Sequence, residues 1–413
     1  MAITLNDIKI GRADKYDQMV IDTFLRKSPI LAAMPFDNCI SPSGGSTLTY
    51  GYIRVRTSPA AEGRDINSDY TAAPATKEAV TTDLKIMGGK YEIDRVLAEA
   101  APDEIAFQTE EKIQATVNRY HWLFINGNKD NDSTEFDGLA EIVDGSVTDF
   151  DGSGIDLSTI SSAATALKLT EALDTAILAM KERPTYILAN SKTIVKIQAA
   201  AKMLGYLTQG EDAFGKPTRA YDGIPLVDLG RYYNEDLGSD TEIIPIDDAS
   251  GKTDIYLVAL SMSGTHGITL KGDKAISSRL PNFADAGAVK SGDVEFVAGL
   301  AVKNTRSIAR IENVQIQATL TTLGDITVAA AVNKVTVTPN KPKIGNKYYY
   351  AVDASASISA PTANTALNTS TWKPLPANGV ISLAENGFVR VVEADSGSLL
   401  PVATGEAGPV VTA

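Results

Sequence analysis

Residues 46–93 carry the most informative pattern in the chain: STLTYGYIRVRTSPAAEGRDINSDYTAAPATKEAVTTDLKIMGGKYEI. Apolar and polar residues alternate from Ser46 to Thr57, which predicts a β-strand. A stretch without core-forming residues follows from Ser58 to Thr76, and a second strand-like run spans Glu78 to Ile93. Two long strands on either side of a polar tip predict an extended hairpin.

The tip of this hairpin is a candidate interaction element. Structureless segments on the order of 20 residues are uncommon in compact domains unless they bind something. The hairpin supplies both charge signs, and a solvated, flexible loop is the alternative interpretation of the same residues. Its candidate contact residues are Arg54, Arg56, Glu62, Arg64 and Asp65.

The strongest helix signal follows the hairpin. Proline and acidic residues at Pro102-Asp-Glu104 favour a helix start, and Gly127 favours its end. Apolar residues recur between these points at helical spacing, which predicts about 23 residues of helix, or about 34 Å. These are Ala106, Ile113, Val117, Tyr120 and Phe124.

The rest of the first 317 residues mixes helices and strands. A helix is predicted from Arg12 to Lys27, with Tyr16 on its main face and Phe24 beside it, broken up by Pro29 and Pro35. Two amphipathic helices are predicted around Leu169–Met180 and Ile194–Leu204. We therefore expect an α+β body. Its predicted strands are Pro184–Ala189, Ile224–Leu229, Glu242–Ile246, Asp254–Ala259 and Val294–Ala298.

The chain changes character near residue 318. Residues Ala318–Ala413 contain six basic and six acidic residues, so the remaining residues carry the whole net charge of −13. Short strands separated by proline, glycine and asparagine predict a small β-sandwich. The predicted strands are Lys334–Thr338, Lys347–Val352, Gly379–Leu383 and Gly387–Glu393.

Composition excludes several functions. With 38 basic and 51 acidic residues among 413, the surface repels phosphate, so sequence-specific nucleic-acid binding is disfavoured. One cysteine, Cys39, allows no intrachain disulfide, and a reducing compartment is compatible with that. The start of the chain lacks the basic and apolar regions of a secretory signal, and no run of about 18 apolar residues predicts a membrane span.

The segments that resemble cofactor-binding motifs each lack a residue that the motif requires. Gly210–Pro217 resembles a phosphate-binding loop, but Pro217 replaces the hydroxyl residue that holds magnesium, and a surface loop is favoured. Asp130–Glu141 resembles a calcium loop, but Glu135 replaces the required glycine. His121 is interpreted as a packed or half-buried helix residue, and His266 lies in a turn-like sequence. We therefore predict no enzyme activity, no catalytic residues, no metal and no cofactor.

The order of these segments resembles the tailed-bacteriophage major capsid proteins of the Hong Kong 97-like fold. The resemblance spans roughly residues 12–316, and the C-terminal part is similar to the immunoglobulin-like domains that some capsid proteins add. The segments that carry it are Lys15–Pro29, Thr49–Ile93, Pro102–Gly127, Phe136–Ile142, Tyr221–Asp228, Ser291–Lys303 and Arg306–Asn313.

The resemblance implies a set of parts. These are an N-terminal arm (1–45), an extended hairpin loop (46–92), a peripheral domain with a spine helix (93–130), an axial domain (131–264) and a return into the peripheral domain (265–317). The added β-sandwich (318–413) is expected on the exterior because of its composition, which is neutral and rich in threonine. Contacts between subunits are expected to involve the five hairpin residues named above together with Tyr16, Phe24, Arg26, Arg279 and Asp285.

The resemblance also implies a function. The chain would self-assemble into pentamers and hexamers of an icosahedral shell around phage double-stranded DNA, in a virion assembled in the bacterial cytoplasm. A separate scaffolding protein, a portal and decoration proteins are the expected partners, with no membrane. Lysine–asparagine links between subunits are an option, from Lys77 or Lys85 to Asn282 or Asn304. The alternatives are an encapsulin-like nanocompartment, and an enzyme or adhesin that carries a β-module.

Overall fold

The structure is a computed structural model, and its chain divides into two compact units. One unit comprises Met1–Asp156, Ile160–Ile246 and Thr253–Val314, and the other comprises Leu157–Thr159, Asp247–Lys252 and Gln315–Ala413. The two units are described separately. The described residues are 28–39, 48–57, 61–72, 74–100, 104–158, 163–205, 209–211, 217–234, 238–247, 250–270, 276–318, 320–323, 327–331, 334–338, 342, 345–354, 357–363, 365–383 and 387–410.

The first unit is organised around one long strand, β15 (Val289–Val302). On one side β15 pairs antiparallel with β4 (Lys85–Asp94), from Val289↔Asp94 to Ala298↔Lys85. On its other side it pairs with β13 (Thr265–Thr269) and β14 (Ser277–Arg279). The short strand β1 (Phe36–Asn38) adds in parallel to β13 and completes a five-stranded sheet.

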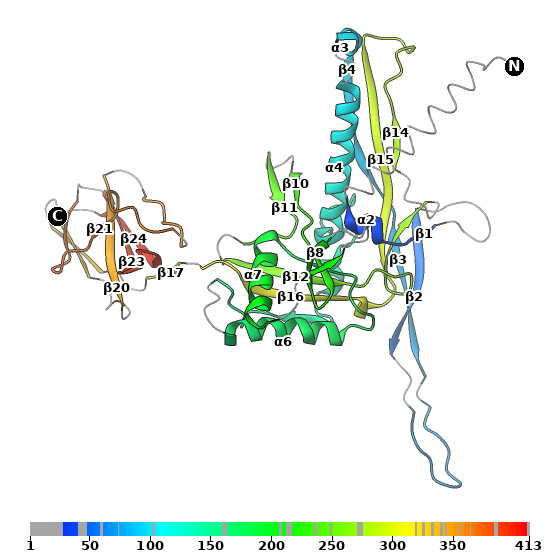
Figure 1. The fold of residues 1–413 in the computed structure, drawn as a ribbon, viewed down its shortest axis with the longest axis horizontal. Coiled ribbons are helices and arrows are strands. Elements are labelled where there is room, and N and C mark those ends of the chain that lie inside the picture. The colour runs from blue at the N-terminus through cyan, green and yellow to red at the C-terminus, as the bar shows by residue number, and fades with distance from the viewer. Residues whose placement is uncertain are drawn as a thin grey trace. The chain divides into compact units, whose positions relative to one another are not determined.

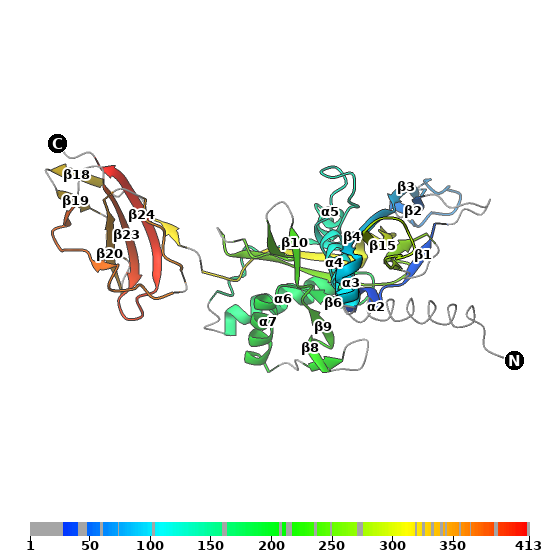
Figure 2. The same ribbon diagram turned by 90° about the horizontal axis from the view of Figure 1, so that it is seen from above.

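The long helix α4 (Glu104–Asn126) lies beside β4 and β15 in both ribbon views (Figures 1 and 2). Alternate residues of β15 pack toward it, because successive strand side chains point to opposite faces. They join the α4 residues Val117, Tyr120 and Phe124 in the main core. The helix prediction is confirmed to within two residues at each end. The strand residues on this face are Val294, Phe296, Ala298, Leu300 and Val302.

Gly127 ends the long helix for a packing reason. A Cβ atom there would lie 2.2 Å from the Phe136 carbonyl oxygen, so a larger residue would push the following loop away. The loop leads to α5 (Leu139–Val143), whose Leu139 and Val143 are buried in the same core.

The opposite face of the sheet holds the base of the hairpin. Strands β2 (Thr49–Thr57) and β3 (Thr76–Asp83) pair antiparallel. A small apolar cluster of Cys39, Leu84, Ile268 and Ala301, with Tyr50 and Tyr52 beside it, joins the hairpin base to the sheet.

The single strand predicted for Glu78–Ile93 is wrong. The structure has two strands, β3 and β4, separated by Leu84, whose backbone N–H bonds to the Leu48 carbonyl at 2.7 Å. At this residue the chain changes partner from β2 to β15. The sequence shows the change only as a slip in alternation, since Leu84 and Met87 are both buried although they lie three residues apart.

A seven-stranded sheet forms the rest of the first unit, in the order β5-β16-β12-β6-β9-β8-β7. Helices α6 (Ala163–Ala179) and α7 (Ser191–Met203) pack against each other and confirm the two amphipathic helices predicted from the sequence. The strands are β5 (Asp149–Asp151), β16 (Ile308–Gln315), β12 (Lys252–Val258), β6 (Tyr186–Leu188), β9 (Ile224–Val227), β8 (Pro217–Tyr221) and β7 (Gln209–Glu211).

A second hairpin joins β10 (Arg231–Asn234) to β11 (Ser239–Glu242). The predicted strand Glu242–Ile246 is therefore wrong, because the strand ends at Glu242. Ile243, Ile244 and Ile246 are buried instead as an irregular segment, and Pro245 has no N–H to offer a sheet. The remaining helices of the described unit are α2 (Pro29–Ala33), α3 (Arg95–Ala100) and the 3₁₀ turn η1 (Thr305–Ser307).

The described part of the second unit is built from strands, as predicted. A five-stranded sheet has the order β17-β24-β23-β20-β21, and a three-stranded sheet has the order β18-β19-β22. The strands are β17 (Thr321–Thr322), β18 (Thr327–Ala331), β19 (Lys334–Thr338), β20 (Asn346–Asp353), β21 (Lys373–Pro374), β22 (Val380–Ser382), β23 (Gly387–Asp395) and β24 (Pro401–Val410).

The two faces of β23 hold two separate apolar clusters. Val389 and Val391 pack with Ile381 of β22, which stacks the two sheets on each other. On the opposite face, Val392 and Ala394 pack with Leu367 and Trp372. The α+β class with an added β domain is confirmed, and its order of hairpin, long helix and returning strand is the order that the Hong Kong 97-like resemblance predicted.

Candidate functional site

The extended hairpin is the candidate site. Strands β2 and β3 lie side by side and lead into the tip, residues 61–72 (Figure 1). Every residue of the tip is exposed. Three large apolar side chains of the hairpin are among the most exposed in the described chain: Ile53 at 66%, Ile66 at 91% and Tyr70 at 62%. The hairpin therefore presents apolar surface to its surroundings instead of burying it.

The hairpin is held at its base by polar contacts. The Tyr50 hydroxyl donates to Asp37 Oδ2 at 2.6 Å, and the Tyr52 hydroxyl accepts from the backbone N–H of Val302 at 3.3 Å. Lys303 Nζ lies 3.6 Å from Asp37 Oδ2 and 5.6 Å from the centre of the Tyr50 ring. These contacts fix where the hairpin leaves the sheet.

The same contacts shift two pKa values. Burial alone would raise the pKa of Asp37, but hydrogen bonds from Tyr50 and the Asn38 N–H, together with the charge of Lys303, lower it. Burial and the Asp37 carboxylate both raise the pKa of Tyr50. Asp37 is therefore held as a carboxylate and Tyr50 as a neutral phenol.

Four predicted hairpin residues have defined local contacts. Arg54 Nη2 donates to the Tyr52 hydroxyl at 3.1 Å, while its buried Nε has no acceptor among the described residues. Arg64 donates to the Ser68 carbonyl at 3.2 Å and lies over the Tyr70 ring. Glu62 accepts from the Thr71 N–H, and the Asp65 carbonyl accepts from Ser68. These contacts shape the tip.

The other predicted contact residues lie elsewhere. Arg279, on β14, faces Asp293 at 3.6 Å and Glu295 at 4.0 Å across the ladder with β15. Asp285 accepts from the Asn282 amide at 2.8 Å in the turn between those strands. Arg56 belongs to β2, but its side chain lies outside the described residues, as do Tyr16, Phe24 and Arg26 altogether.

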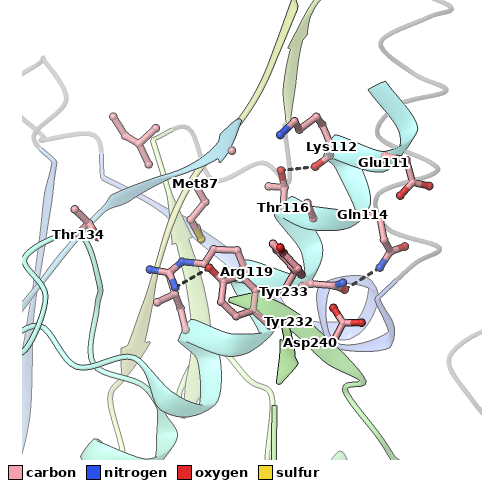
Figure 3. A pocket seen from close by; sticks show the side chains of 15 residues that line it. Met87, Glu111, Lys112, Gln114, Thr116, Arg119, Thr134, Tyr232, Tyr233 and Asp240 are labelled. Carbon is pink, nitrogen blue, oxygen red and sulfur yellow. Dashed lines mark hydrogen bonds between the residues drawn. The ribbon is translucent and has the colours of Figure 1, made fainter. Parts of the chain in front are cut away.

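Sequence reasoning missed a groove of about 690 Å³ on the polar side of α4 (Figure 3). It runs between α4, β4 and the β10–β11 hairpin. Arg119 is its best-defined residue, since it donates to the Tyr232 hydroxyl at 3.3 Å and to Glu135 at 2.9 Å. The α4 residues Glu111, Gln114 and Asn118 recur at helical spacing and resemble an ordinary solvent-facing stripe. No pattern in the sequence indicates that the β10–β11 hairpin lies beside this face of α4.

The remaining chemistry candidates have structural roles. His121 is buried, in agreement with its interpretation as a packed residue, whereas the turn predicted around His266 is wrong because that residue is buried within β13. Asp132 accepts from the N–H and hydroxyl of Thr134 in a tight loop. Residues 212–216 of the Gly210–Pro217 motif lie outside the described residues, and their neighbours form β7 and β8.

Three of the candidate cross-linking residues are hydrogen-bonded within the chain, and one of them is Asn282, described above. Lys85 Nζ donates to the Ser133 carbonyl at 2.7 Å, and the Asn304 side chain caps η1 by accepting from the Arg306 N–H. Within the described residues, no cluster of three histidine, cysteine or acidic side chains is arranged to hold a metal ion. None of the helices described there has the length and apolar character needed to cross a bilayer.

No protein-family model matches the chain, and no curated protein matches it. Among solved structures, the chain is similar to the holo-SrpI encapsulin complex of Synechococcus elongatus PCC 7942, with 17% identity and a TM-score of 0.49 over 71% of this chain and 89% of that one. It is also similar to a structure from Mycobacterium phage Bobi, with 12% identity and a TM-score of 0.46 over 69% and 90% of the two chains. The virus-like particle from Pyrococcus furiosus is similar as well, with 11% identity and a TM-score of 0.40 over 72% of this chain and 98% of that one.

Proposed function

We propose that this chain is the self-assembling subunit of a closed protein shell with the Hong Kong 97-like arrangement of parts. The hairpin is the observation that carries the proposal. An isolated two-stranded hairpin is at best marginally stable in water, and the described hydrogen bonds of residues 61–72 join tip residues to one another. Cover from a neighbouring copy would bury Ile53, Ile66 and Tyr70 and stabilise the hairpin.

Repeated contacts of this kind suit a shell. A stable interface buries on the order of 1,000 Å² or more, and several such contacts per subunit reinforce one another once the assembly closes. The inter-subunit set comprises Arg54, Arg56, Glu62, Arg64 and Asp65 on the hairpin. We add Tyr16, Phe24 and Arg26 of the N-terminal arm, and Arg279 and Asp285 near β14.

The finer function we propose is that of a tailed-phage major capsid protein. Pentamers and hexamers would enclose double-stranded DNA in a virion assembled in the bacterial cytoplasm, with scaffolding, portal and decoration proteins as partners. A net charge of −13 favours confinement of DNA without tight phosphate binding. We assign arm, hairpin, peripheral, axial and exterior β-sandwich roles to the ranges predicted above, and we place the low-charge residues 318–413 outside the shell.

The test is electron microscopy of the purified chain with a matched pair of variants. We expect closed shells from the natural sequence and dissociated, folded subunits from the double substitution Ile66→Asp, Tyr70→Asp. The control is Leu178→Asp on α6, where the side chain is 84% exposed but lies outside the hairpin. Normal shells from the hairpin variant, or no shells from the natural chain, would overturn the proposal. Protein cargo in place of nucleic acid inside native particles would favour the encapsulin-like alternative.

A further inference from the structure

Three segments far apart in the sequence meet at the buried imidazole of His121. His121 Nε2 lies 2.6 Å from Ser28 Oγ, just before α2, and Nδ1 lies 3.3 Å from the Leu229 carbonyl oxygen, after β9. Ser28 is fully buried and His121 is 3% exposed. The imidazole therefore connects the N-terminal segment, the long helix and the β9–β10 loop at one point.

The hydrogen-bond partners define one protonation state. Because a carbonyl oxygen only accepts, Nδ1 carries the proton and Nε2 presents a lone pair. The Ser28 hydroxyl then donates to Nε2, and Ser28 Oγ accepts from the Leu31 N–H at 3.0 Å, which caps α2. The neutral imidazole thus satisfies every polar group in this chain of contacts.

We propose that His121 is an acid-sensitive latch that holds residues 28–34 against the long helix while it is neutral and releases them when it is protonated. A second ring proton removes the acceptor of the Ser28 hydroxyl and leaves a positive charge on a buried side chain. The released segment lies within the range predicted as the N-terminal arm, residues 1–45. The latch does not depend on the proposed shell function.

Among the described residues, no charged side chain is hydrogen-bonded to His121, whose ring partners are Ser28 and the Leu229 carbonyl. The segment from Ser28 to Met34 contains no charged residue, and the α4 neighbours Gln114 and Asn118 bond to each other. The adjoining cavity of about 470 Å³ is lined by three charged residues from other elements. Of these, Asp228 accepts from the Gly230 N–H and Arg231 pairs with Glu242. The third is Asp240 on β11.

Burial lowers the pKa of His121 to about 4, against a smaller opposing effect of the Leu229 carbonyl. A released, solvated imidazole titrates near 6.5, so acid favours the released state, which binds the proton more tightly. These two values predict that the released population rises about 30-fold between pH 8 and pH 5. The released population is therefore smallest at neutral and alkaline pH and rises as the pH falls below about 6.

The test is amide hydrogen exchange of the full chain, corrected for the intrinsic pH dependence of exchange. We expect protection of the Ala32 and Met34 amides, which bond to the Ser28 and Ile30 carbonyls, to fall about 30-fold from pH 8 to pH 5. His121→Gln should remove that pH dependence, and His266→Gln, at the other buried histidine, should retain it. Equal protection at both pH values in the natural chain, or an unchanged response in His121→Gln, would overturn the latch.

A second measurement needs no variant to fold. The chain has two histidines, so the exchange rate of the imidazole C2 proton, followed by mass spectrometry, reports the pKa of each one separately. We expect His121 to titrate below pH 5 in the closed state. A value near 6.5 would show that the imidazole is already solvated and would refute the proposal.

Discussion

The ring of Tyr120 packs edge-on against the ring of Phe296, with centroids 5.6 Å apart and planes inclined at 70°. This contact joins the middle of α4 to the middle of β15, and both side chains are fully buried. It therefore connects the longest helix and the longest strand among the described residues of the first unit.

Replacement of Phe296 by alanine should destabilise the first unit by about 3–5 kcal/mol, because it removes a buried ring and leaves a cavity. Urea unfolding of dissociated subunits, followed by tryptophan fluorescence, measures this change. Phe107→Ala is the matched control, since Phe107 lies on α4, the helix against which Phe296 packs, but is 56% exposed, and it should change stability by less than about 0.5 kcal/mol. Equal effects of the two substitutions would contradict this account of the core.

Gly88 should not tolerate alanine. Its φ of +155° is unfavourable for other residues, and a Cβ atom there would lie 1.9 Å from the Val294 carbonyl oxygen. The β4–β15 ladder would have to separate, so we expect a loss of at least about 2 kcal/mol in unfolding free energy. Gly63→Ala, in the hairpin tip where nothing lies within 4 Å, should be neutral. A Gly88→Ala variant as stable as the natural chain would contradict this prediction, because it would show that the β4–β15 ladder accommodates a side chain here.

Arg310 should be far more sensitive to substitution than an exposed arginine. Its side chain is 8% exposed and bonds to Asp149 through two nitrogens, at 2.8 and 2.7 Å, and to Asp144 at 2.9 Å. Arg310→Met leaves these carboxylates without a positive partner, and we expect a cost of about 3–5 kcal/mol. Arg183→Met breaks a pair whose arginine is 61% exposed and should cost at most about 1 kcal/mol. Comparable melting temperatures for both variants would refute the difference.

The hairpin base should weaken in strong acid. Asp37 has a pKa below its ordinary value of 3.8 in the folded chain, so its stabilising effect is complete above that value and is lost as pH falls through the lower, folded value. Amide exchange at the start of β2 should therefore rise below about pH 4. Asp37→Asn should show faster exchange at neutral pH and no further acid response. Persistence of the response in that variant would assign it to another group.

Local pattern was enough to predict the long helix and the hairpin. The spacing of Ile113, Val117, Tyr120 and Phe124 requires no information from elsewhere in the chain, and neither does the alternation from Leu48 to Val55. The added β domain was visible from composition for the same reason, since its low charge and frequent turns are local properties.

The failures share a physical cause, which is that the deciding partner is distant in sequence. One strand ends at Asp83 and another begins at Lys85 because the partner of the second strand, β15, lies about 200 residues further along the chain. His266 has turn-forming neighbours, yet pairing with Ala301 places it in a strand. The groove beside α4 exists because β10 and β11 pack against a face of the helix. The sequence of that face resembles an ordinary solvent-exposed surface.

The pairing of β4 with β15 also has a consequence for biosynthesis. Ribosomes add about 5–20 residues per second, so the strand that ends at Asp94 leaves the exit tunnel roughly 10–40 seconds before its partner. Met87, Tyr91 and Ile93, all buried in the folded chain, lack their neighbours on β15 during that interval. Until β15 is made, β4 therefore has an unpaired edge, and such an edge favours strand pairing between neighbouring nascent chains.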